Sequence, residues 1–186
     1  MKKVLVVLFA FLFFTINQAF AYRITDFSSD TKIIAAMQML EQAGEQDVFR
    51  NLQRSGIRVK FADLSKYAYN SHKCYAVNTY NEFGSRVILI NVMYKNAPTE
   101  QIACLIAHES CHVKRVADLE EETIATQKEA ATWTRLRVAS KVYPDTALTK
   151  RLNKISNLYL ASDSHNNLIQ QKIASSSFYS TQLGLN

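Results

Sequence analysis

The chain of 186 residues has few of the residues that interrupt helices, with four glycines and two prolines. Glycine and proline are the residues least compatible with a helix interior. No glycine occurs between Gly84 and Gly184, and apolar residues recur there at spacings of three and four. This pattern predicts helices over residues 98–116, 119–142 and 145–161, separated by a short turn and by Pro144.

The basic residues form no run of the kind that binds nucleic acid. The formal net charge is +6, but the lysines and arginines are scattered, with no arginine-rich segment and no aromatic ladder beside them. We therefore expect no nucleic-acid partner.

The one long apolar run, from Val4 to Phe14, is too short to cross a bilayer, which needs about 20 apolar residues. Two lysines precede the run and Ala19-Phe20-Ala21 follows it, which is the layout of a secretory signal peptide. No cysteine lies just after this run, where a lipid anchor would be attached, so no lipid anchor is indicated. We expect residues 1–21 to be removed after Ala21, leaving a secreted or periplasmic protein without stable membrane insertion.

Cysteine is scarce, and its spacing excludes a cysteine-rich zinc module, because no two of the three cysteines have two-residue spacing. An oxidising compartment favours one disulfide bond. Cys104 and Cys111 lie seven residues apart, about 10 Å along a helix, which is too far for a bond between them. The prediction is a bond from Cys74 to one of these two.

The first half of the chain predicts a helix followed by a small sheet. Residues 31–54 have the period of an amphipathic helix, and the segments IRVKFADL, CYAVNTY and SRVILINV read as three strands. A short helix is expected near residues 168–173. The expected fold class is α+β, with one domain over residues 22–186. Its core spans about 31–142, and a helical extension covers 145–175.

One predicted helix contains the segment HESCH, with polar residues where a buried helix is otherwise apolar. His108 and His112 lie about 40° apart on the helical wheel, so both imidazoles can bind one metal ion. Glu109 falls within the apolar stripe, where an unpartnered carboxylate is costly. Beside a metal-activated water, it would act as a general base.

HESCH resembles the HExxH motif of the zincin metallopeptidases, and the order of predicted elements over residues 31–142 resembles the minimal core of that superfamily. The resemblance implies Zn²⁺ held by His108 and His112, with Glu109 as general base and acid. It also implies that the strand at residues 87–91 lies at the cleft edge and pairs with an extended substrate.

A catalytic zinc has three protein ligands. Asp118 has the spacing of the third ligand in the metzincin branch. That branch, however, has glycine where this chain has Arg115, and it requires a methionine downstream. No methionine follows Met93, so the metzincin arrangement is excluded.

The gluzincin branch takes its third ligand, a glutamate, from the following helix. If the chain reverses near Ala117, Glu122 comes opposite His112, which makes Glu122 the preferred ligand. Glu129 is the alternative, and the glutamate that is not a ligand can orient a ligand histidine through its free N–H. Glu120 and Glu121 are expected to point elsewhere, as first-turn charges favoured by the helix dipole.

These features predict an exported zinc metallopeptidase that hydrolyses peptide bonds in a peptide or protein substrate. The alternative is a zincin-like binding protein with a structural zinc and little turnover, its site closed by Cys104 or Cys111. The sequence identifies neither the substrate nor the oligomeric state.

Overall fold

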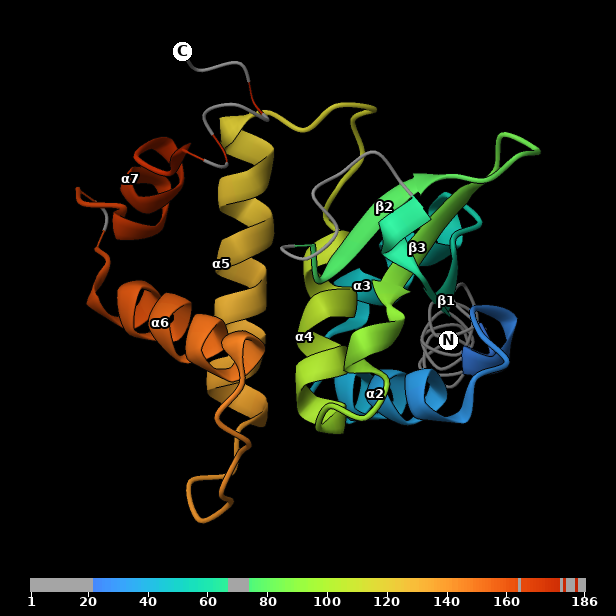
Figure 1. Cartoon of the computed structure of the whole chain (residues 1–186), viewed down its shortest axis with the longest axis horizontal. Helices are drawn as coiled ribbons and strands as arrows, with labels where there is room; N and C mark the ends of the chain where they lie inside the picture. The colour runs from blue at the N-terminus through green and yellow to red at the C-terminus, as the bar shows by residue number, and fades with distance from the viewer. Residues whose placement is uncertain (1–21, 67–73, 164, 178, 180–182, 184–186) are drawn as a thin grey trace, which may run out of the picture.

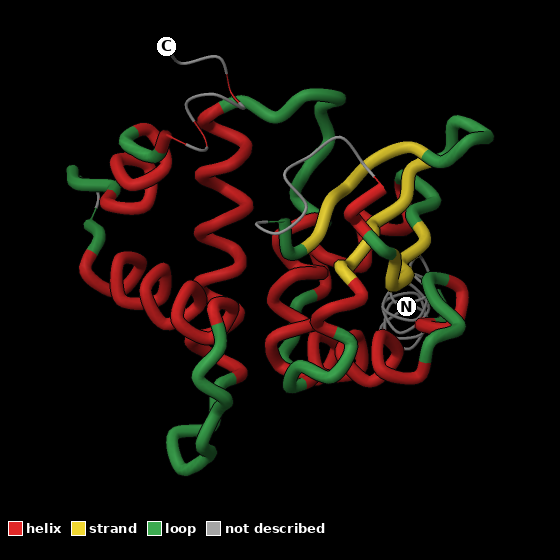
Figure 2. The backbone as a smooth tube through the Cα atoms, viewed as in Figure 1, coloured by secondary structure: helices red, strands yellow, loops and turns green. Residues whose placement is uncertain are grey.

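The computed structural model describes residues 22–66, 74–163, 165–177, 179 and 183, and the predicted signal segment 1–21 lies outside them. The described residues form an α+β fold of six α-helices and one three-stranded mixed sheet (Figures 1 and 2). Three short 3₁₀ helices, η1 (Ile24–Asp26), η2 (Leu64–Lys66) and η3 (Val92–Tyr94), complete the described elements. Within this part of the chain, no helix combines the length and the apolar character that crossing a bilayer requires.

The predicted helix over residues 31–54 is two helices, α2 (Thr31–Gln42) and α3 (Gln46–Arg54). The Asp30 side chain begins α2 by accepting hydrogen bonds from the backbone N–H groups of Lys32 and Ile33. The break lies at Gly44, whose φ is +77°, a left-handed conformation that glycine adopts without strain. The prediction of one continuous helix is therefore wrong, because the apolar period continues across this turn.

The three predicted strands are present as β1 (Arg58–Ala62), β2 (Ala76–Tyr80) and β3 (Arg86–Asn91). The sheet order is β1-β3-β2, with β3 parallel to β1 and antiparallel to β2. The expectation that residues 87–91 form the cleft edge is wrong, because β3 is the central strand and both of its edges are paired. Among the described strands, β1 and β2 lie at the two edges of the sheet. On the outer side of β1, the backbone N–H of Val59 donates to the Phe27 carbonyl at 2.8 Å, whereas the outer edge of β2 pairs with no other described strand.

The second half of the chain is helical, as predicted, with boundaries that differ. It contains α4 (Thr99–Glu109), α5 (Leu119–Leu136), α6 (Ala147–Ala161) and α7 (Leu168–Ala174). The first predicted helix, 98–116, ends early, since α4 stops at Glu109 and the apolar Val113 and Val116 that extended the pattern are exposed. The second, 119–142, stops at Leu136. In Figure 1, α4 lies between the sheet and α5, and α6 and α7 lie beyond α5.

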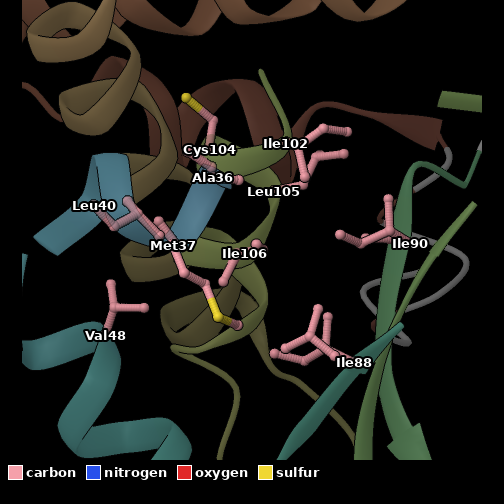
Figure 3. Packing of buried hydrophobic residues seen from close by; sticks show 14 of the residues in the cluster. Ala36, Met37, Leu40, Val48, Ile88, Ile90, Ile102, Cys104, Leu105 and Ile106 are labelled. Atoms are coloured by element: carbon pink, nitrogen blue, oxygen red, sulfur yellow. The ribbon is translucent and has the colours of Figure 1, made fainter. Parts of the chain in front are cut away.

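The hydrophobic core surrounds α4, and every residue from Glu100 to Glu109 is buried. Figure 3 shows Met37 of α2 beside Ile106 of α4, while Ile88 and Ile90 of β3 point toward the same helix. Burial of an aliphatic side chain of this size contributes about 2 kcal/mol. This packing fixes the position of the helix that carries His108 and Glu109.

Candidate metal centre

The motif lies at the end of α4 rather than inside a continuous helix. Glu109 is the last helical residue, and His112 follows in a turn. The backbone N–H of His112 donates to the Glu109 carbonyl at 3.3 Å. The last carbonyls of a helix have no partner within it. The sheet provides partners here. Asn78 Nδ2 of β2 donates to the Glu109 carbonyl at 2.8 Å, and Arg86 of β3 donates to the His112 carbonyl at 2.7 Å.

The first turn of α5 brings Glu122 to the two histidines. The Nε2 atoms of His108 and His112 are 3.3 Å apart. The Glu122 carboxylate has one oxygen 3.8 Å from Nε2 of His108 and the other 3.7 Å from Nε2 of His112. Ligand atoms on one tetrahedral zinc ion are about 3.4 Å apart. These three residues therefore form a group that could hold a metal ion.

The group is buried as well as convergent. His108, His112 and Glu122 are 7%, 8% and 5% exposed, and Glu109 is 7% exposed. Two imidazoles and two carboxylates so far from water are costly unless charges or a metal compensate them. A single divalent ion would compensate the group, which is a second reason that these residues fit a metal.

Glu129 lies on the opposite side of the His108 ring from Glu122. Its carboxylate is 3.0 Å from Nδ1 of His108 and is completely buried. The ring N–H is not aligned with that oxygen as in an ideal hydrogen bond, but the contact favours the proton on Nδ1 and leaves Nε2 free for a metal. Between the two glutamates considered as third ligand, Glu122 faces the Nε2 atoms and Glu129 takes the supporting position.

Glu121 does not point away from the site, as the sequence predicted, but is buried beside it. Its carboxylate accepts hydrogen bonds from the N–H groups of Val113 and Lys114 at 2.7 and 3.0 Å and lies 3.6 Å from Nδ1 of His112. Each histidine of the group thus has a carboxylate at its second nitrogen. Glu120 is exposed, as expected.

The electrostatics differ between the two histidines. Burial lowers the pKa of His112 to about 4, helped by the neighbouring His108. Burial also acts to lower the pKa of His108, but the contact with Glu129 outweighs it and the pKa is raised. Burial raises the pKa of Glu109 to about 7, although His108 opposes the shift. This shift applies to the metal-free protein, and a divalent ion beside Glu109 would oppose it.

Three residues that support the site were not predicted from the sequence: Arg151, Asn78 and Arg86. Arg151 of α6 forms an ion pair with Glu129, and Asn78 binds the end of α4. Burial acts to raise the pKa of Glu129, but Arg151 and His108 hold it at about 2. A lone arginine in the pattern of an amphipathic helix gives no signal of such a role, and neither does an asparagine in a short strand.

The remaining candidates lie apart from this group. Asp118 caps α5 by accepting from the N–H of Glu121 and pairs with Lys114. Cys74, Cys104 and Cys111 are free thiols, so the predicted disulfide bond is not formed. Among the described residues, the potential metal group contains His108, His112 and Glu122 and no cysteine.

Comparison with models of protein families, with curated proteins and with solved structures gave no match for this chain. The geometry of the site is therefore the basis for assigning a function.

Proposed function

We propose that this protein is an exported zinc-dependent peptidase with a zincin-like fold. The observation that carries the proposal is the convergence of His108, His112 and Glu122, with Glu109 next to His108 at the end of α4. Three protein ligands leave one position open for water or substrate, as in catalytic zinc sites. The chain order of the N-terminal helices, three strands and the helices α4 and α5 supports the zincin-like part of the proposal.

A zinc ion in this site would supply a Lewis acid that polarises the scissile carbonyl and lowers the pKa of a water molecule. Glu109 would accept the proton of that water and then donate it to the departing amine. Burial raises the pKa of Glu109 to about 7 in the metal-free protein. A zinc ion beside the carboxyl would lower this pKa and favour the deprotonated form, which accepts the proton.

The free edge of β2 supports a peptide as the substrate. The strand is antiparallel to β3, and Asn78 near its middle contacts the carbonyl of Glu109. An extended chain added to this edge would form main-chain hydrogen bonds close to the base. This position replaces β3 as the expected substrate strand.

The first test is the metal content of purified residues 22–186, prepared without chelators, for the parent and Glu109→Gln. We expect about one zinc per chain in both. The parent should cleave a mixture of internally quenched peptides of random sequence, and the variant should lose this activity by at least about 100-fold.

Zinc in both proteins without cleavage of any peptide would instead favour a binding protein with a structural zinc. Absence of zinc from the parent after loading and dialysis would reject the metal centre itself.

A further inference from the structure

Arg151 joins three separate parts of the chain behind the proposed metal centre. Its guanidinium forms an ion pair with Glu129 of α5, which is completely buried. It lies 5.3 Å from the centre of the Tyr75 ring, directly before β2, and it is hydrogen-bonded to the side chain of Tyr179 near the C-terminus. Arg151 is therefore restrained from several sides.

The two carboxylate oxygens of Glu129 contact different partners. One carboxylate oxygen binds Arg151, and the other lies 3.0 Å from Nδ1 of His108. A carboxylate held at one oxygen by a guanidinium cannot rotate freely, so its second oxygen keeps a fixed direction. That direction determines which nitrogen of His108 carries a proton and how the ring is oriented.

We propose that Arg151 is a positioning residue of the metal centre, which aims Glu129 at His108 and so keeps Nε2 of His108 directed at the metal. The inference rests on the proposed zinc site and extends it to α6 and to the C-terminal segment. Tyr75 and Tyr179 flank the guanidinium: the aromatic face attracts the cation, and the hydroxyl group restricts its rotation.

The test measures the zinc dissociation constant by competition with a chromophoric chelator for the parent, Arg151→Gln and Arg151→Lys. Loss of an outer hydrogen-bond partner of a ligand histidine weakens metal binding about 10- to 100-fold. Arg151→Gln keeps Glu129 but releases it from the guanidinium, so we expect a loss at the lower end of that range, about 10-fold. The loss should be smaller for Arg151→Lys, which keeps the charge but not the planar fork. Lys150→Gln is the matched control on the same helix, because Lys150 and its partner Asp145 are exposed. It should bind zinc as the parent does.

A second readout is the Nδ1–H proton resonance of His108 in the zinc-loaded proteins, one of only four histidines in the chain. It should be sharp in the parent and broadened by faster exchange in Arg151→Gln. A role limited to stability would lower the melting temperature and change neither the zinc affinity nor this resonance.

Parent-like affinity and an unchanged resonance in Arg151→Gln would overturn this inference while leaving the zinc site intact. If Arg151→Gln does not fold, Arg151→Lys decides, and parent-like affinity in that variant overturns the inference. A parent that binds no zinc would overturn both this inference and the proposed function.

Discussion

The two sides of α4 are buried by opposite chemistry. Toward α2 and the sheet, α4 packs aliphatic side chains such as Met37, Ile106 and Ile88, which are all completely buried. Toward α5, its last turn faces the carboxylates of Glu122 and Glu129. An apolar contact tolerates repacking that conserves its volume, whereas a buried charged contact stabilises the fold only when each group has its partner. The side of α4 toward α2 and the sheet therefore holds the helix in place. The side toward α5 presents the polar groups that could bind a metal ion.

The largest expected effect is on the apolar side. Met37→Ala removes a completely buried side chain and should lower the free energy of unfolding by about 3 to 4 kcal/mol, through lost burial and the cavity left behind. Urea unfolding measures this loss. Among molecules that remain folded, the zinc dissociation constant should not change. A large loss of zinc affinity would show that the two sides of α4 are not independent.

The next effect is on the polar side. Glu122→Ala removes the one carboxylate that faces both Nε2 atoms and should weaken zinc binding by more than about 100-fold, beyond the effect of losing an outer partner. Glu120→Ala, two residues earlier on an exposed position, is the control and should bind zinc normally. Full zinc in Glu122→Ala would move the third ligand to another residue.

A third prediction concerns pH. Burial raises the pKa of Glu109 from 4.5 to about 7 in the folded, metal-free protein. Its contribution to stability is therefore fully present below pH 4.5 and is lost as the pH rises through 7. Glu109→Gln lacks this loss and should be more stable than the metal-free parent by about 3 kcal/mol at pH 8, with little difference near pH 4. Thermal unfolding at the two pH values measures the difference, and equal stability at pH 8 would contradict it.

The smallest effect concerns the junction between the sheet and α4. Arg86→Met removes the donor to the His112 carbonyl and should lower the free energy of unfolding by about 1.5 kcal/mol. Arg58→Met on the exposed face of β1 is the control. A loss no larger than that of the control would mean that Arg86 contributes little to holding the end of α4.

The residues facing the metal position could be predicted from the sequence because helical geometry connects them. A spacing of four places His112 near His108 even though His112 lies in the turn after α4, and a short reversal places Glu122 at their level. Among the supporting residues, Glu129 was predicted in that role as the alternative to Glu122. The roles of Arg151 and Asn78 could not be predicted, because they depend on contacts between elements distant in the chain. Glu121 is buried because the chain after His112 folds back onto its carboxylate.

The errors in the predicted fold have a similar cause. The apolar period gave no sign of the turn at Gly44 or of the end of α4, since Val113 and Val116 continue the pattern although they are exposed. The order of the strands depends on how the chain crosses after β1, which periodicity does not encode.

The early end of α4 has a consequence for anyone who wishes to transplant this centre. Because His112 lies beyond the last helical residue and its carbonyl is bound by Arg86, a synthetic peptide of residues 99–129 would contain every proposed ligand yet lack the clamp that sets one of them. A transplanted centre would therefore need α4 and α5 together with the hairpin of β2 and β3. In the transplanted centre, Arg86 of that hairpin would hold the His112 backbone and so set the distance between the two imidazoles.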